Sequence, residues 1–298
     1  METNCESKLK FKTIAVATDL GDSSSAALRY GRAMARAYGS TLVVVHVIDP
    51  LAYAFPKGAP PLLTANAAAA AELKKIEEET SASGIAVHSV IESGIVSDRI
   101  LATLQDYHAD LLVLGTRAKT EAGRVALGTI ARQLLARSHC PVLTVSPDAI
   151  ASLPWAGCWR RVLAATDFSP ASIRALHCAH QAALRQLILV HVTQGPTTKE
   201  SSHFLERLRS LAPFNESHTV PVEHFVVVGV AGLLIAEYAE KFGADLVVLG
   251  SPENELTEQD FATSTVLQVV SRVKCPVLCL PDLRVSSPAE LLQEVSKL

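Results

Sequence analysis

Short runs of aliphatic and β-branched residues recur along the chain, with few polar residues inside each run. Such runs are typical of strands that are buried on both faces of a parallel sheet. Longer stretches with helical spacing lie between them. In the first half of the chain this pattern predicts five strands, at residues 13–17, 41–48, 85–91, 111–114 and 142–145. It predicts four helices between them, at residues 23–38, 64–81, 97–107 and 128–138.

The second half of the chain repeats the first. The repeated sequences are Ala-Thr-Asp at 17–19 and 165–167, His-Val at 46–47 and 191–192, Ala-Asp-Leu at 109–111 and 244–246, and Cys-Pro-Val-Leu at 140–143 and 275–278. The last two pairs are offset by 135 residues and the first by 148, so the second copy is shorter in its middle. A repeat of this kind predicts two homologous domains. We place them at residues 1–147 and 158–298, joined by a linker over 146–157 that contains two prolines and a glycine.

The second copy has the same order of elements as the first. Its strands are predicted at residues 162–165, 187–192, 222–228, 246–249 and 277–280, and its shorter second helix at about 198–211. Strict alternation of strands and helices favours parallel sheets with right-handed crossovers. The sequence therefore predicts an α/β fold with two tandem doubly wound five-stranded parallel-sheet domains, and we expect the strand order 3-2-1-4-5 in each.

Composition excludes several classes of partner. The formal net charge is -3 and only 19% of residues are charged, so the chain lacks the basic surface that nucleic acid requires. The first eleven residues contain no apolar stretch of the secretory type, and the nearest apolar run, residues 42–48, is too short to span a bilayer. We expect a cytoplasmic protein with no nucleic-acid or membrane partner. Its six cysteines form no C-x-x-C pair, and we expect them to be reduced thiols.

A candidate ligand site follows the fourth strand of the first copy. In open parallel sheets ligands bind at the carboxyl ends of the strands, where Asp19, Val47 and the segment from Gly115 to Thr129 are predicted to lie. Three basic residues and one acidic residue give that segment a net charge of +2, and Arg117 is one of the three. Exposed amides at a helix start bind anions, and a threonine hydroxyl suits a phosphate oxygen or Mg²⁺.

Purely structural roles are open at the same positions. The glycines at 115 and 128 would serve equally as a strand exit and a helix entry. Asp19 would serve as a turn or cap residue before the first helix. The paired histidines at 177 and 180 lack a carboxylate or cysteine at a suitable distance, so we expect no metal site.

These motifs together resemble the universal stress proteins, in a tandem two-domain form. The resemblance occurs once in each half, and the two matches together cover nearly the whole chain. Nucleotide-binding members of that family carry Gly-x2-Gly-x9-Gly-Ser/Thr after the fourth strand, and here the spacing is intact but Ala118 replaces the second glycine. The resemblance implies that ATP binds in the first domain. The residues it implies around the adenine and ribose are Ala17, Thr18, Asp19, Val47 and Leu114, and those around the phosphates are Gly115, Ala118, Gly128, Thr129 and Ile130.

The second copy lacks this phosphate motif. Glu253 and Thr263 stand where the second and third glycines would be, and the segment carries four acidic and no basic residues. Repulsion of a triphosphate follows from this charge, so we expect no ATP in the second domain. The resemblance also implies that the last strands of the two domains, residues 141–145 and 276–280, meet edge to edge and make the chain a covalently linked pseudo-dimer. The sequence is also compatible with a homodimer of two whole chains.

The sequence thus predicts an ATP-binding regulatory protein of the stress response. ATP, with or without Mg²⁺, would occupy the first domain, and an unidentified regulatory protein would recognise the nucleotide state. The alternative is a scaffold that binds proteins independently of nucleotide. A third class, an enzyme of related fold, requires catalytic residues that the sequence does not contain, so we expect at most slow ATP hydrolysis.

Overall fold

The computed structural model describes residues 9–50, 62–119, 125–147, 149, 153–154, 157–195, 198–211, 220–251 and 264–281. In the first half the main strands are β1 (Thr13–Ala17), β2 (Thr41–Ile48), β3 (Val87–Ser93), β4 (Leu111–Gly115) and β7 (Val142–Val145). The helices are α1 (Asp22–Tyr38), α3 (Leu62–Ala82), α4 (Val96–Asp106) and α5 (Thr129–Arg137). The aliphatic runs form strands because four of the five residues of β4 and all four of β7 are buried between helices.

The second half contains the same series of elements. Its strands are β8 (Trp159–Ala165), β9 (Ala183–Thr193), β10 (Val222–Val228), β11 (Leu246–Ser251) and β12 (Val277–Pro281). Its helices are α6 (Pro170–Ala182), α7 (Thr198–Leu211), α8 (Ala231–Lys241) and α9 (Thr265–Val270). The predicted strand order is confirmed, because the strands of each half follow the order 3-2-1-4-5, as β3-β2-β1-β4-β7 and β10-β9-β8-β11-β12.

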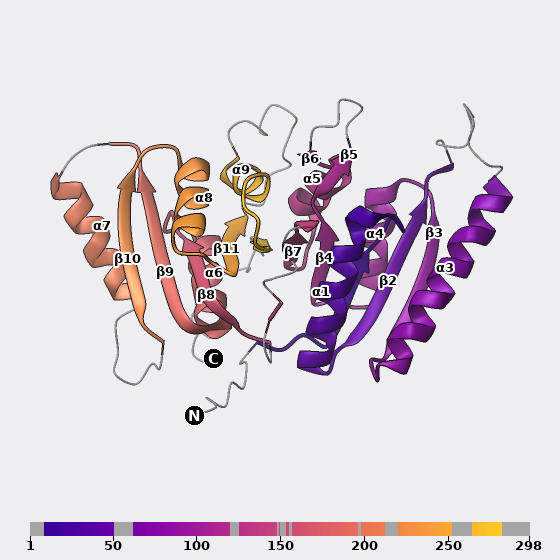
Figure 1. The fold of residues 1–298 in the computed structure, drawn as a ribbon. Coiled ribbons are helices and arrows are strands. Elements are labelled where there is room, and N and C mark those ends of the chain that lie inside the picture. Colours follow the sequence, from indigo (N-terminus) through magenta and orange to yellow (C-terminus); the bar gives the residue numbers. More distant parts are fainter. Residues whose placement is uncertain are drawn as a thin grey trace.

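The two halves share one ten-stranded sheet (Figure 1). Strand β12 pairs with β7, and this is the one antiparallel pairing among the described strands of the large sheet. Thr144 lies opposite Val277, and its hydroxyl also donates to the Val277 carbonyl at 3.2 Å. The expected meeting of the last strands is therefore present, and each domain covers an edge that the other would leave unpaired.

Helices cover both faces of this sheet. Apolar side chains of α1, α3 and α6 form one core cluster with the strands, and those of α4, α5, α8 and α9 form the second on the opposite face. Each cluster contains residues of both domains. Helices α3 and α7 lie at the two outer ends of the molecule (Figure 1). The linker also contacts the first domain, since the Tyr38 hydroxyl donates to the Gly157 carbonyl at 2.6 Å.

Several features differ from the sequence prediction, and among them strands β8 and β9 begin three and four residues earlier than predicted, at Trp159 and Ala183. The segment after β4, predicted as a loop, contains a hairpin in which β5 (Arg117–Lys119) pairs antiparallel with β6 (Val125–Leu127). Strand β3 begins at Val87, two residues later than predicted. Cys158 is disulfide-bonded, so the expectation of reduced thiols is wrong for that residue and holds for four others: Cys140, Cys178, Cys275 and Cys279. No described helix is long and apolar enough to cross a membrane.

Candidate functional site

The turn after β1 is held by its own side chains. Thr18 is buried; its N–H donates to the Val45 carbonyl at 3.0 Å, and its hydroxyl lies 2.8 Å from that of Ser24. The same hydroxyl accepts the Leu20 N–H at 3.0 Å. These bonds keep Leu20 at a φ of 60°, a conformation that is strained for a leucine. Thr18 is therefore turned inward to hold the turn.

Asp19 lies exposed in this turn. Its Oδ1 accepts the Gly21 N–H at 3.0 Å, which is the turn role that the sequence left open. A carboxylate accepts several hydrogen bonds, so the same side chain can also meet a ligand at the carboxyl edge of the sheet.

His46 supports the turn from the neighbouring strand. Its Nδ1 lies 2.9 Å from the Thr18 carbonyl oxygen. The second domain repeats this arrangement, because His191 Nδ1 lies 2.8 Å from the carbonyl oxygen of Thr166. The histidine that follows the second strand's apolar run therefore ties the carboxyl ends of two adjacent strands together in each domain, a role that the sequence alone did not indicate.

Apolar side chains from several elements meet beside this turn. Ala17 and Val47 come from β1 and β2, and Ile130 comes from the first turn of α5. All three are half-buried and pack onto the same core cluster, the one that also contains the buried Leu114. Because they lie at the carboxyl edge and keep part of their surface exposed, they can contact the apolar face of a flat ligand.

The start of α5 supplies the polar part of the site. Gly128 is the N-cap, with an extended backbone, and the Arg132 N–H donates to its carbonyl at 3.1 Å. By helix geometry the N–H groups of the three residues between them have no partner inside the helix, and such groups bind anions. Thr129 is exposed, and its hydroxyl accepts from the Arg132 guanidinium at 3.2 Å. Arg132 was missed at the sequence level, although its i,i+3 spacing from Thr129 could have identified it.

The hairpin β5–β6 carries the remaining predicted residues. Gly115 ends β4, and the Gly128 N–H donates to the Thr116 carbonyl at 3.4 Å, so the hairpin closes directly above the sheet. Ala118 lies in β5 opposite Ala126. An extended backbone holds an alanine without strain, and the side chains of Arg117 and Ala118 lie outside the described part of the structure. The assignment of both residues to a phosphate site stays a prediction.

The corresponding segment of the second domain, residues 252–263, lies outside the described residues. Its preceding glycine is described. A Cβ on Gly250 would lie 2.5 Å from the backbone carbon of Ala171 and the backbone nitrogen of Ser172, far closer than ordinary contact. Helix α6 therefore approaches β11 so closely that only glycine fits. Packing alone therefore requires a glycine at position 250, and its presence does not indicate a phosphate site.

Asp167 repeats the turn geometry of the first domain. Its Oδ1 accepts the Ser169 N–H at 2.9 Å, and Phe168 has a φ of 65°. Burial raises the pKa of Asp167, but hydrogen bonds from Ser169 and Ser172 lower it by more, so the pKa lies below its ordinary value. The carboxylate is thus stabilised by the turn itself and needs no ligand beside it.

Comparisons with known proteins agree with this architecture. The family model described as the universal stress protein family matches residues 10–146 and again 159–281. The Thermus aquaticus protein named "Universal stress protein in QAH/OAS sulfhydrylase 3'region" is 31% identical over 137 residues, which are 45% of this chain and 98% of that protein. Universal stress protein MJ0531 of Methanocaldococcus jannaschii is 27% identical over 139 residues, 45% of this chain and 82% of that protein.

Solved structures also match the chain over both of its halves. A universal stress protein of Archaeoglobus fulgidus shares the fold with a TM-score of 0.70 at 20% identity, over 90% of this chain and 98% of that one. The double match of the family model agrees with the repeated strand order of the two halves. The chain belongs to the universal stress protein family and carries two of its domains in tandem.

Proposed function

We propose that the first domain binds ATP at the carboxyl edge of its sheet and that the chain acts as a nucleotide-dependent regulatory protein. The observation that carries the proposal is the convergence of three kinds of group at one edge. Half-buried apolar side chains (Ala17, Val47) can receive the adenine, the Asp19 carboxylate can accept from its polar edge, and the start of α5 can hold the phosphates.

Charge supports the same assignment. Helix α5 directs free N–H groups outward at its start, and Arg132 places a guanidinium beside Thr129. The hairpin sequence adds a net charge of +2. An anion at a helix start gains about 0.3 to 2 kcal/mol, and each guanidinium bond to a phosphate strengthens this. A triphosphate therefore fits the first domain better than an uncharged ligand would.

The test is nucleotide binding by the full chain. Purified protein is extracted with acid and the extract examined for adenine nucleotide by mass spectrometry, and ATP is then titrated by calorimetry with and without Mg²⁺. Gly128→Asp places a carboxylate at the start of α5 and should eliminate binding while the circular dichroism spectrum stays unchanged. Thr263→Asp, at the matching position of the second domain, is the control and should bind ATP like the wild type.

Two results decide against the proposal. Absence of heat and of bound nucleotide at millimolar ATP would favour the scaffold that binds proteins without nucleotide. Normal binding by Gly128→Asp would place the nucleotide elsewhere. Phosphate release should be slow, because the described residues of this site position a nucleotide without supplying a general base.

The remaining parts of the proposal concern biology. We propose that the protein works in the cytoplasm during stress, within domain limits near 1–147 and 158–298, and that a regulatory partner distinguishes its nucleotide states. Comparing the proteins retained by immobilised chain with and without ATP tests the last point, and a partner set that ignores ATP would contradict it.

A further inference from the structure

Three large apolar side chains lie exposed where β10 leads into α8. Val228 is 51% exposed, Val230 is 56% exposed and Leu233 is 48% exposed. Single exposed apolar residues are ordinary on a protein surface. Three of them within one turn of the chain are not, and clusters of this kind mark surfaces that contact other molecules. The cluster lies in the second domain, whereas the proposed ATP site belongs to the first.

The exposed face of α8 continues beyond this cluster. Val230, at the N-cap, and Leu233 are followed by Glu237 and Glu240, which are also exposed. The spacing of 3, 4 and 3 residues places all four on one side of the helix, in the pattern of the a and d positions of a coiled coil. The opposite side of the helix packs into the core, where Ile235 is buried. We call these four exposed positions the α8 seam, two apolar positions followed by two acidic ones.

The matching helix of the first domain, α4, differs at a key position of the seam. Asp98 stands where the second domain has Leu233, and its carboxylate lies 2.8 Å from the Arg137 guanidinium of α5. The second domain keeps the arginine as Arg272, which donates to the Gln268 carbonyl at 3.0 Å instead. Where the first domain has an ion pair between two helices, the second thus exposes a leucine to water, which is unfavourable. A contact outside the chain accounts for this leucine.

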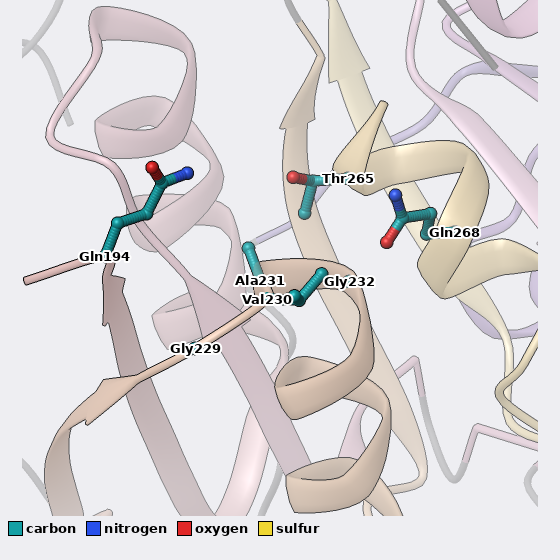
Figure 2. A pocket seen from close by; sticks show the side chains of 7 residues that line it. All are labelled: Gln194, Gly229, Val230, Ala231, Gly232, Thr265 and Gln268. Carbon is teal, nitrogen blue, oxygen red and sulfur yellow. The ribbon is translucent and has the colours of Figure 1, made fainter. Parts of the chain in front are cut away.

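A hollow beside Val230 gives depth to the apolar end of the seam. It has a volume of about 340 Å³ and lies between the starts of α8 and α9. Figure 2 shows Val230 and Ala231 at the start of α8, and Thr265 and Gln268 across from them on α9. A large side chain that packs against Val230 therefore finds room between the two helices.

The acidic end of the seam is only weakly neutralised by its neighbours. Lys274 Nζ lies 3.9 Å from Glu240 Oε1, but the two side chains are 79% and 82% exposed, and a pair as exposed as this contributes little. Lys241 Nζ lies 5.2 Å from the centre of the Tyr238 ring. The sequence that connects β11 to α9 carries four acidic and no basic residues. These charges favour a basic partner.

A second copy of the chain does not complement this seam. If two α8 helices met antiparallel, Val230 and Leu233 of one copy would face Glu240 and Glu237 of the other, and carboxylates would be buried against apolar groups. If the two helices met in parallel, each glutamate would face the same glutamate of the other copy and the charges would repel. The seam therefore fits a helix of different sequence.

We propose that the α8 seam binds an amphipathic helix of another protein. The partner helix has apolar side chains opposite Val230 and Leu233, and lysines or arginines opposite Glu237 and Glu240. Helices that meet through such a seam pack nearly side by side, and an apolar helix face laid on an apolar surface is a recurring mode of recognition. The contact is short, so the complex is reversible. It does not depend on the proposed ATP site.

The probe is a synthetic helical peptide with leucines at the a and d positions of one half and lysines at those of the other. It is made in both sequence orders, which correspond to parallel and antiparallel packing on α8. Two-dimensional NMR of the full chain follows the methyl signals of Val230 and Leu233, assigned by their disappearance in Val230→Ser and Leu233→Asp. One order should shift both signals. Leu233→Asp, which introduces the residue of the first domain, should weaken binding by about tenfold or more, because the burial of a leucine is lost.

A charge exchange separates this binding from unspecific adhesion of an amphipathic peptide. Glu237→Lys combined with Glu240→Lys should weaken the lysine peptide by about fivefold or more. The same variant should bind a peptide with glutamates in place of the lysines more tightly than the wild type does. Ile95→Ser changes the exposed N-cap of α4 in the first domain and should leave binding unchanged. Gly128→Asp should also leave it unchanged, so a failure of the ATP site is distinguishable from a failure of this surface.

The proposal is overturned if neither peptide order shifts the Val230 and Leu233 signals at millimolar concentration. It is also overturned if Leu233→Asp binds as tightly as the wild type, or if Ile95→Ser weakens binding as much as Leu233→Asp. Dimerisation of the chain alone in analytical ultracentrifugation, abolished by Leu233→Asp, would show that a second copy occupies the seam and would overturn it as well. Unchanged circular dichroism of each variant excludes unfolding as the cause.

Discussion

Gly250→Ala is expected to destabilise the second domain without touching the nucleotide site. The glycine is the last residue but one of β11 and lies against the start of α6, where Ala171 and Ser172 are found. A new Cβ would lie 2.5 Å from the Ala171 backbone carbon and 2.8 Å from its oxygen. Because these are backbone atoms, no side-chain rotation relieves the overlap.

The size of the effect follows from this geometry. Carbon atoms pack at about 3.5 to 4.0 Å, so α6 has to move away from β11 by about 1 Å. Helix α6 buries Ala175 and Leu176 against the sheet, and a shift of the whole helix disturbs these contacts. Overpacking of a core costs about 1 to 3 kcal/mol, and a backbone clash places this variant near the upper end. A loss of about 3 kcal/mol lowers Tm by roughly 6 to 12 °C.

Thermal unfolding followed by circular dichroism measures this loss. Gly84→Ala is the control, because nothing lies within 4 Å of a Cβ there and only its φ of 80° resists the substitution. The control should lose about 1 to 2 kcal/mol through strain alone. If Gly250→Ala loses no more than Gly84→Ala, or if it changes ATP affinity, the close approach of α6 is not the reason for this glycine.

Three further predictions concern other parts of the fold. Gly31→Ala places a Cβ 2.3 Å from Val16 Cγ2, so it should lower the free energy of unfolding by about 1 to 3 kcal/mol. Adding Val16→Ala should recover at least about 1 kcal/mol of this loss, and additive losses in the double variant would contradict the contact. Asp167→Asn should cost most stability at neutral pH and least in acid. The ionised carboxylate stabilises the fold at pH values above its ordinary pKa of 3.8, and this contribution disappears as the pH falls through the lowered pKa of the folded state. Urea unfolding at pH 7 and at acid pH measures the difference, and a loss independent of pH would refute the assignment. Burial raises the pKa of the Cys279 thiol to about 12, so iodoacetamide at pH 8 should label this thiol only when urea unfolds the chain. Mass spectrometry of the peptides detects the label, and labelling of the folded chain would contradict the burial of Cys279.

Three strands were predictable to the residue because their boundaries coincide with those of the apolar runs. Residues 41–48, 142–145 and 222–228 form strands over the predicted ranges. The prediction failed by two residues at β3, where Ile85 is buried but lies before the first paired residue. An apolar side chain indicates burial and does not by itself indicate a ladder of backbone hydrogen bonds.

The candidate site was predictable only in its location. The carboxyl-edge rule placed Asp19, Val47 and the start of α5 together, and the structure brings them to one edge. The hairpin was not predicted, because its strands have three residues each and one of them, Arg117–Lys119, has a basic residue at each end.

The most direct test of the account is the crystal structure of the full chain grown with excess ATP and Mg²⁺. We expect one nucleotide per chain, with its phosphates at Gly128 and Thr129, its base beside Val47, and no phosphate density in the second domain. An empty first-domain edge, or a triphosphate held by the second domain, would contradict the account.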